Sequence, residues 1–280
     1  MLIPDSIHPS WNEFLTTEIL EELKEIESKI GNNYNPRPSN RVLRFLSLDL
    51  KEIKCIFLGM DAYPAKDTGF VKKEIVDEDI NSFKYIKPED LAMSVDTNSE
   101  VDDMVAFSLV PTGRSFEVGN LSSWSDKFRQ VSLKNIVRLL HKNYNNIEDY
   151  SKIKKFSDIQ KEIESGSFKI LPPSKLFDSW EEQGVLCLNV YPTCEIGKPG
   201  SHKDIWHNFS IKLLDYISRT NSDISWFLWG KEAISHKEYI LSGKIIESRH
   251  PMMCSIKYED DFLKSNCFKD TMDKINWLGI

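Results

Sequence analysis

Apolar side chains recur at two different spacings along the chain, and each spacing predicts one kind of element. Over residues 10–30 they recur every three or four positions, which is the spacing of an amphipathic helix. Ser10 followed by Glu13 predicts a capping box at the start of this helix. The same spacing predicts a second helix over residues 131–143. The pattern therefore predicts one helix before and one helix after the apolar run at residues 53–58.

Short continuous apolar runs mark the expected strands. They cover residues 53–58, 184–189, 224–230 and 244–251, with a further short run at 105–111. A helix over residues 203–219 and a short helix after residue 230 separate the last three of the longer runs. Strand and helix thus alternate beyond Pro172, and this alternation predicts an α/β fold with a parallel sheet.

Two stretches interrupt the regular pattern. Residues 65–104 mix charged with scattered apolar side chains, which predicts an acidic insertion on the surface. Residues 144–170 are polar and rich in lysine, which predicts a helical excursion. A chain of 280 residues is ample for a sizeable hydrophobic core. We therefore expect a single domain over residues 1–280 that carries both stretches.

Composition and charge narrow the class of protein. With 40% hydrophobic and 28% charged residues, the chain has the composition of an ordinary globular protein. No apolar run approaches the roughly 20 residues of a membrane span, and residues 1–10 lack the features of a signal peptide. We therefore expect an intracellular protein that is not secreted and has no membrane partner. The net charge of -7 argues against coating nucleic acid by bulk charge but leaves room for a local basic groove.

The cysteines indicate neither a disulfide framework nor a metal site. There are five of them, which is an odd number, and they are widely spaced without a CxxC pair. We expect reduced thiols that lie mostly in the core. They are Cys55, Cys187, Cys194, Cys254 and Cys267.

Four of the apolar runs end on polar or turn residues. The runs lead into GMDAYP, NVYPT, GK and HPMMCS. Because the carboxyl ends of parallel strands meet at one edge of a sheet, Asp61, Asn189, Lys231 and His250 are expected to converge there. Each one alone is more often structural, since Asn189 suits an Asx turn and His250 is held by the proline that follows it. Four together at one edge indicate a site.

The same motifs resemble those of family 1 uracil-DNA glycosylases. That family is usually written with GQDPYH, LLLNxxLT, SHxxxxW, LLWGS and HPSPLS, and here they stand in the same order as GMDAYP, LCLNVYPT, SHKDIW, FLWGK and HPMMCS. The family's AFSV is matched by AFSL at 106–109. The proline after Tyr63 and the lysine after Gly230 are most similar to the poxvirus type. The resemblance implies a three-layer αβα sandwich around a central, mostly parallel four-stranded sheet.

The resemblance also implies a role for each residue of the site, with no cofactor and no metal. Asp61 would position a water and stabilise the sugar cation, while a neutral His250 would donate to uracil O2 with help from the backbone N–H of Met60. Asn189 would read the base and Tyr63 would exclude the thymine methyl group. Phe107 would stack on the extruded base, although a core phenylalanine is the plain alternative.

The expected DNA contacts rest on short loops. The phosphate candidates each compete with a simpler interpretation as a solvated surface residue, and they are Arg114, Ser115, Ser201, His202, Lys231 and Ser255. Cys254 stands where the family usually has a leucine that wedges into the duplex, so Met252 and Met253 are expected to take that role. Ala62 and Pro64 replace the family's proline and histidine around Tyr63, which predicts a shift of the water-holding loop and lowered activity.

Three functional hypotheses follow. The first is a monofunctional uracil-DNA glycosylase of base-excision repair, whose partner is uracil-containing DNA in single- or double-stranded form. The second is a glycosylase for another modified pyrimidine, although the bulk of Tyr63 opposes a C5 substituent. The third is a glycosylase-like scaffold that works as a DNA-binding replication factor and contacts a protein partner through the insertion. Retention of both Asp61 and His250 favours an enzyme.

Overall fold

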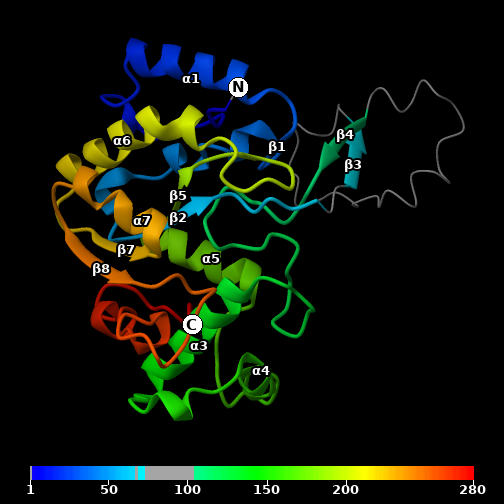
Figure 1. Cartoon of the computed structure of the whole chain (residues 1–280), viewed down its shortest axis with the longest axis vertical. Coiled ribbons are helices and arrows are strands. Elements are labelled where there is room, and N and C mark those ends of the chain that lie inside the picture. The colour runs from blue at the N-terminus through cyan, green and yellow to red at the C-terminus, as the bar shows by residue number, and fades with distance from the viewer. Residues whose placement is uncertain (1, 67–68, 73–103) are drawn as a thin grey trace, which may run out of the picture.

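The computed structural model describes residues 2–66, 69–72 and 104–280, and its centre is a parallel sheet of four strands (Figure 1). The strands lie in the order β5-β2-β7-β8, and each neighbouring pair is parallel. Their bounds are β2 Cys55–Asp61, β5 Val185–Tyr191, β7 Ser225–Trp229 and β8 Lys244–Ser248. The order is not sequential, so the chain crosses over the sheet by helices, as the alternation of runs predicts.

Side chains on the central strand β2 alternate between two cores. Cys55 and Phe57 pack into a cluster on one face of the sheet. Ile56 and Leu58 pack into a separate cluster on the other face. Because successive side chains of a strand point to opposite faces, a strand that is buried on both sides reads as an unbroken apolar run. This explains why the sequence shows no polar alternation over residues 53–58.

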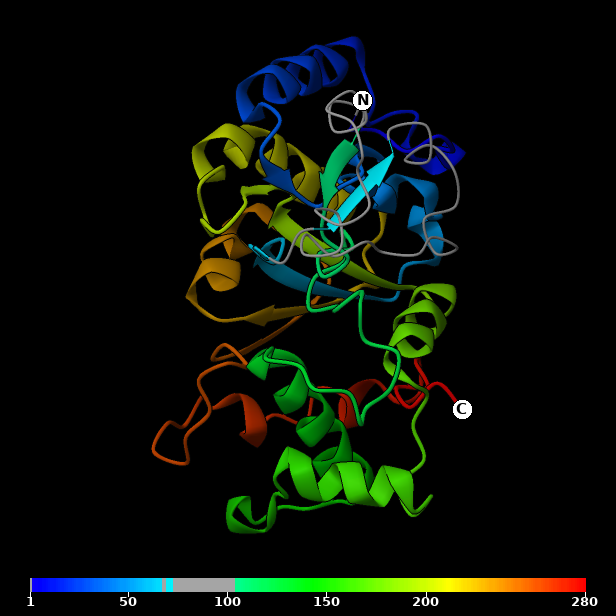
Figure 2. The ribbon, with the colours of Figure 1, turned by 90° about the vertical axis from the view of Figure 1, so that its right-hand side faces the viewer.

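Helices cover both faces of the sheet, which confirms the predicted three-layer αβα sandwich (Figure 2). One outer layer holds α1 Thr17–Ile30 and α6 Lys203–Thr220. The other holds α3 Val131–Tyr144 and α5 Pro173–Glu182, with α4 Phe156–Glu164 packed on α3. The short α7 Lys231–Ser235 follows β7 directly. None of the helices among the described residues has the length and apolar character needed to cross a membrane.

The predicted capping box at the first helix is wrong. Residues Pro9–Trp11 form a short 3-10 helix, and α1 begins only at Thr17, where the Thr16 hydroxyl accepts from the amide of Ile19 at 3.4 Å. The hydroxyl of Ser10 instead accepts from the amide of Leu50 at 3.0 Å. Burial of Trp11 against Phe45 turns the chain before the helix starts, and a local capping signal cannot reveal this long-range contact.

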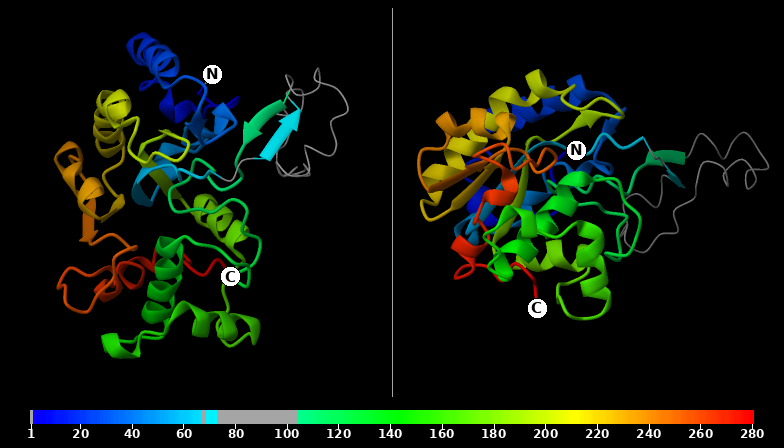
Figure 3. Two further views of the ribbon diagram at one scale, coloured as in Figure 1. Left: turned by 45° about the vertical axis from the view of Figure 1, so that its right-hand side comes forward. Right: turned by 60° about the horizontal axis from the view of Figure 1, so that its bottom comes forward.

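Two small antiparallel pairs lie outside the main sheet. β1 Tyr34–Asn35 pairs with β6 Cys194–Glu195, and β3 Gly69–Lys72 pairs with β4 Met104–Phe107. The β3–β4 pair stands away from the three layers (Figure 3). Most of the predicted acidic insertion over 65–104 lies outside the described residues. The predicted helical excursion over 144–170 is confirmed by α4 and a 3-10 turn at Tyr150–Lys152. The remaining 3-10 turns are Ser39–Arg41, Arg44–Ser47, Leu50–Glu52, Lys237–Tyr239, Phe262–Lys264 and Lys269–Thr271.

Candidate active site

The carboxyl ends of all four sheet strands meet at one edge, and the predicted residues lie there. In the register of β2 and β5, Gly59 is opposite Asn189, and Asp61 is opposite Tyr191. On the neighbouring strands, Trp229 of β7 is opposite Ser248 of β8. A Cβ on Gly230 would lie 2.8 Å from the Cβ of His250, so the turns after β7 and β8 touch. The sheet therefore brings Asp61 and Asn189 together on one pair of strands, and Gly230 and His250 together on the other pair.

Asn189 is buried at the end of β5, where Gly59 makes room for its side chain. A Cβ on Gly59 would lie 2.8 Å from Asn189 Oδ1 and 2.8 Å from the Cβ of Ser115. Asn189 is only 4% exposed, and its Oδ1 has no hydrogen-bond partner among the described residues. A buried acceptor without a partner costs about 1–3 kcal/mol, so a ligand that offers an N–H donor gains that energy here. Sequence reasoning missed Gly59, although it stands directly before the Met-Asp pair of the motif.

Asp61 ends β2 with its carboxylate held from one side. The backbone N–H of Gly200 donates to Asp61 Oδ2 at 2.5 Å. The pKa of Asp61 is raised to about 6, mainly by burial and to a smaller extent by nearby Glu232, whereas the Gly200 amide and the Cys194 thiol oppose the rise. The carboxylate is therefore ionised above pH 6 and is protonated easily below it.

His250 is held in one orientation by its own loop. The backbone N–H of Met252 donates to His250 Nδ1 at 3.1 Å, and the N–H of Met253 donates to the His250 carbonyl at 2.9 Å. The side chain of Asn135 on α3 fixes the next residue by donating to the Pro251 carbonyl at 2.5 Å. Burial lowers the pKa of His250 below its usual value. The ring is therefore neutral near pH 7, and its proton is on Nε2.

The loop after Asp61 is fastened although Ala62 and Pro64 depart from the family pattern. Asn35, which is 1% exposed, donates through Nδ2 to the carbonyls of Tyr63 at 3.1 Å and Ala65 at 3.0 Å. The carbonyl of Pro64 accepts from the amide of Gly197 at 3.1 Å. Sequence reasoning missed Asn35, whose partners lie 28 and 30 residues away.

The ring of Tyr63 is also fixed. Its hydroxyl donates to the carbonyl of Phe116 at 3.4 Å. Phe116 has a left-handed backbone with φ of 65°, which is strained for a residue with a side chain, and its ring packs against Trp229 and His250 with centroids 5.4 and 6.1 Å apart. Phe116 therefore links Tyr63 to His250. Sequence reasoning did not identify Phe116.

Phe107 and Met60 lie on strands beside the site. Phe107 is the last residue of β4, but its side chain is outside what the structure describes. Met60 is half-buried on β2 between Gly59 and Asp61. The predicted stacking of Phe107 and the predicted donation by the Met60 amide stay predictions.

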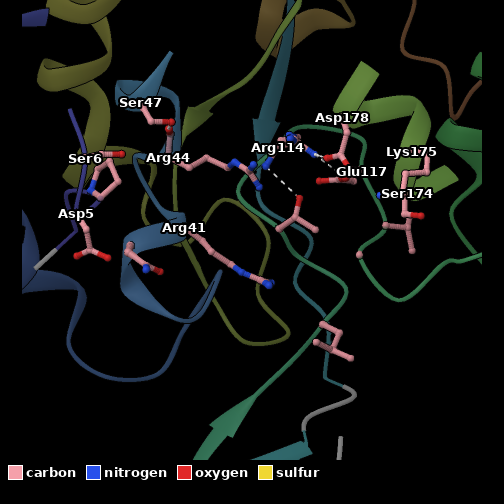
Figure 4. A pocket seen from close by; sticks show the side chains of 16 residues that line it. Asp5, Ser6, Arg41, Arg44, Ser47, Arg114, Glu117, Ser174, Lys175 and Asp178 are labelled. Atoms are coloured by element: carbon pink, nitrogen blue, oxygen red, sulfur yellow. Dashed lines mark hydrogen bonds and ion pairs between the residues drawn. The ribbon is translucent and has the colours of Figure 1, made fainter. Parts of the chain in front are cut away.

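Three of the predicted phosphate contacts have interior positions instead. Arg114 is 8% exposed, and its guanidinium donates to Glu117 at 3.0 Å and to Asp178 at 2.9 Å (Figure 4). It also donates to Glu181 at 2.7 Å. The buried hydroxyl of Ser115 donates to the carbonyl of Phe57 at 3.1 Å. His202 is also buried, and its Nδ1 lies 2.9 Å from the hydroxyl of Thr193. These side chains are already bonded to other residues of the protein, and their predicted phosphate contacts stay predictions.

The other DNA candidates are accessible to different degrees. Lys231 is exposed at the start of α7, and the exposed Ser201 accepts from the amide of Glu195 through its hydroxyl at 2.7 Å. Met252 and Met253 are 57% and 59% exposed. Cys254 is half-buried and donates to the Pro251 carbonyl at 3.3 Å.

The methionine loop is anchored at its far end by Asp261, which sequence reasoning did not identify. Asp261 is 1% exposed and accepts from the amides of Ser255 at 2.5 Å and Leu263 at 3.0 Å, as well as from the hydroxyl of Tyr150 at 3.0 Å. The loop thus has a fixed base and two exposed apolar side chains at its tip. This is the geometry of a wedge that enters a base stack.

Across residues 2–66, 69–72 and 104–280, no group of three or more His, Cys, Asp or Glu side chains is arranged to hold a metal. The site offers one carboxylate, one neutral imidazole with a free N–H, and one buried carboxamide.

Comparisons with known proteins agree with this geometry. No protein-family model matches the chain. It is 27% identical over 277 residues to the uracil-DNA glycosylase of Borrelia turicatae, covering 95% of this chain and 92% of the relative. It is 36% identical over 132 residues to that of Francisella philomiragia, covering 43% of this chain and 60% of the relative.

Solved structures show the same fold. The crystal structure of mimivirus uracil-DNA glycosylase aligns with a TM-score of 0.60 at 19% identity, covering 98% of this chain and 83% of that one. The UNG structure from Nitratifractor salsuginis aligns with a TM-score of 0.59 at 18% identity, covering 96% of this chain and 92% of that one.

The fold and the loops at its carboxyl edge define a DNA N-glycosylase, an enzyme that hydrolyses the bond between a base and its sugar. Over 95% of its length the chain is similar to a curated uracil-DNA glycosylase, at 27% identity.

Proposed function

We propose that this chain excises uracil from DNA through Asp61, His250 and Asn189, leaving an abasic site. The observation that carries the proposal is the buried Oδ1 of Asn189, on the strand beside that of Asp61, for which the described part of the chain offers no hydrogen-bond partner. Uracil offers a donor at N3 and an acceptor at O4, and one carboxamide satisfies both. Cytosine presents the opposite pattern, so the same amide rejects it.

Asp61 is assigned to the sugar. Cleavage of the N-glycosidic bond gives an oxocarbenium-like sugar and an anionic base, so a negative charge near C1′ lowers the barrier. The raised pKa of Asp61, about 6, still leaves the carboxylate ionised at neutral pH. The same carboxylate would orient the water that completes hydrolysis.

His250 is assigned to the leaving base. Because Met252 occupies Nδ1, the remaining Nε2–H is free to donate to uracil O2 as negative charge develops there. A neutral donor stabilises the anion without first losing a proton. The backbone N–H of Met60 is proposed as a second donor.

Tyr63 and Phe107 are assigned to the fit of the base. Tyr63 is held by Phe116 and by the Asn35 clamp on its backbone, so its ring cannot easily retreat from a C5 methyl group. A rigid clash discriminates more strongly than the ~1–3 kcal/mol that a methylene contributes in a hydrophobic pocket. Phe107 would stack on the flipped uracil.

The outer loops are assigned to DNA binding. Met252 and Met253 would fill the gap left by the flipped base, with Cys254 behind them. Phosphates would be met by Lys231, by Ser201 and by backbone N–H groups near Ser255. Pro64 and Lys231 are the basis for a poxvirus-like subtype within the family.

A protein partner is a further proposal. A structural neighbour is the mimivirus UNG Y322L variant in complex with UGI, at a TM-score of 0.61. For this chain, the stretch over 65–104 is the proposed partner surface. The enzyme would act wherever DNA lies in the cell.

The test is a panel of labelled oligonucleotides that carry one uracil, thymine, cytosine or 5-hydroxymethyluracil, followed by alkaline cleavage at abasic sites. Scission at uracil alone is expected. Scission at the C5-substituted base would favour the modified-pyrimidine alternative. Tight DNA binding without scission at any base would favour the binding scaffold.

A further inference from the structure

Three hydrogen bonds connect the segment 194–200 to the loop that carries Asp61. The Cys194 thiol donates to the carbonyl of Ala62 at 3.2 Å. The N–H of Gly197 donates to the carbonyl of Pro64 at 3.1 Å, and the N–H of Gly200 donates to Asp61 Oδ2 at 2.5 Å. The catalytic loop is therefore bound along its length by one neighbouring segment.

We propose that Cys194 and Gly200 are positioning residues that hold the Asp61 carboxylate in its reactive orientation. The inference rests on the proposed function of Asp61. The Gly200 amide fixes one carboxylate oxygen and leaves the other for the water and the sugar. The Cys194 thiol binds the Ala62 carbonyl and so holds the backbone directly after the carboxylate.

The thiol of Cys194 is suited to this role by its surroundings. It is fully buried, and it donates its single proton to the Ala62 carbonyl at 3.2 Å. Burial and the negative charge of Asp61 raise the pKa of Cys194 to about 12, so the sulfur keeps its proton and acts as a donor. A thiolate there would repel the carboxylate.

The position of Cys194 is set by a second contact on the other side of the loop. In the β1–β6 pair, Cys194 is opposite Asn35, whose side chain binds the carbonyls of Tyr63 and Ala65. The two residues therefore grip the loop from adjacent strands. A substitution at Cys194 is therefore expected to affect Ala62 and Asp61 first, because the thiol binds the Ala62 carbonyl.

The charges that face Asp61 make these donors necessary. Glu232 on α7 raises the pKa of Asp61, although Glu232 itself is bound by Lys203 at 2.6 Å and by the hydroxyl of Tyr191 at 2.8 Å. On the remaining sides lie the Tyr191 phenol and the Cys194 thiol, both neutral near pH 7. Hydrogen bonds to the ionised form are thus what offset burial and Glu232.

The experiment compares Cys194→Ala with Cys194→Ser, and Cys267→Ala is the matched control at another buried cysteine. In Cys194→Ala we expect the acid limb of the kcat profile to move up by roughly half a pH unit or more, the value of one lost hydrogen bond. We expect kcat at pH 6.5 to fall several-fold, with KM for uracil-containing DNA changed less than about twofold. Cys194→Ser keeps a donor and should restore the profile, and Cys267→Ala should not move it.

Gly200 gives a second pair of variants. Its φ is +73° and a Cβ there would meet nothing within 4 Å, so Gly200→Asn should be tolerated with the amide in place. Gly200→Val disfavours that backbone and should move the acid limb as Cys194→Ala does. An unmoved midpoint in both Cys194→Ala and Gly200→Val would overturn the proposal, even if kcat fell uniformly across the pH range.

A direct titration separates this proposal from the glycosylase assignment. The 13C carboxyl resonance of Asp61 reports its pKa by NMR without any turnover. A higher pKa in Cys194→Ala supports the positioning role even if the wild-type chain releases no uracil. An unchanged pKa contradicts the positioning role even if the chain is an active glycosylase.

Discussion

The backbone N–H of Met252 donates to Nδ1 of His250 at 3.1 Å, and this single contact fixes which ring nitrogen can serve the substrate. With Nδ1 occupied as an acceptor, the neutral ring carries its proton on Nε2. Met252, whose exposed side chain is a proposed DNA contact, thus also sets the tautomer of the proposed uracil donor. In this proposal one loop serves both DNA binding and base recognition.

The pH profile of uracil release should be limited on the acid side by Asp61. Asp61 must be ionised, and its pKa is raised to about 6. Burial lowers the pKa of His250, which favours the neutral ring. The rate should rise through about pH 6 and level off near pH 7. Initial rates from pH 4.5 to 9 measure this.

His250→Asn is the control for that profile. It should lower the plateau by about 10²–10³-fold, the usual effect of losing one donor to a developing anion, and leave the midpoint near pH 6. A midpoint that disappears with His250 would show that the histidine, not Asp61, governs the acid limb.

Asp61→Asn should make the protein more stable while abolishing activity. The folded protein binds the Asp61 proton more tightly than the unfolded chain, because the pKa rises from 3.8 to about 6. Ionisation therefore costs stability as pH rises through that window, by about 1–3 kcal/mol. The gain in Tm from Asp61→Asn should be small at pH 4 and full above pH 6.5, and thermal melts at several pH values measure it.

Asp126→Asn is the matched control, because the pKa of Asp126 is lowered whereas that of Asp61 is raised. The Asp126 carboxylate accepts from the amides of Ser122 and Ser123 and from the Ser122 hydroxyl, and these bonds lower its pKa. Its substitution should reduce Tm above pH 4. Equal changes in Tm for the two substitutions would contradict the proposed stability cost of ionising Asp61.

Gly59→Ala should displace the base-reading amide. Its new Cβ would fall 2.8 Å from Asn189 Oδ1 and from the Cβ of Ser115, so Asn189 must move. A displacement of this size costs roughly 10²-fold in kcat/KM. Gly31→Ala, at a helix end with open space around it, should lower stability without lowering kcat/KM. Undiminished uracil excision by Gly59→Ala would refute the placement of Asn189.

The double variant Met252→Ala/Met253→Ala should lose activity mainly on duplex DNA. A wedge is needed only where a base must leave a stack, so excision should fall by about 10-fold or more on duplex and less than about threefold on single strands. Leu241→Ala, which changes another exposed apolar residue, is the control. Equal losses of activity on duplex and single-stranded DNA would contradict the proposed wedge role of Met252 and Met253.

Much of the fold was predictable because it depends on local pattern. Unbroken apolar runs located β2, β5 and β7, which are buried between the two helical layers, and helical spacing located α3 and α6. The edge strand β8 is partly exposed, and Ile245 and Ile246 are its apolar residues. The helix α5 went unpredicted although Leu176, Phe177 and Trp180 have helical spacing. The structure shows that its apolar face packs against β5.

Site residues were predictable from the sequence only where they lie at or directly after the end of a strand. Asp61, Asn189 and His250 follow apolar runs, so sheet topology alone brings them to one edge. Sequence reasoning proposed Arg114 as a phosphate contact because a sequence shows a charge but not its partners. In the structure its partners Asp178 and Glu181 lie 64 and 67 residues further on. The contacts of Asn35 and Gly200 also depend on tertiary structure.

The central claim is tested most directly by measuring free uracil released from a duplex with a single deoxyuridine, under single turnover, for the wild-type chain and Asp61→Asn. We expect one uracil and one abasic site per duplex from the wild type. We expect Asp61→Asn to bind the same duplex and release uracil at least 10³-fold more slowly. Wild-type binding without uracil release, or equal release by both proteins, would contradict the claim.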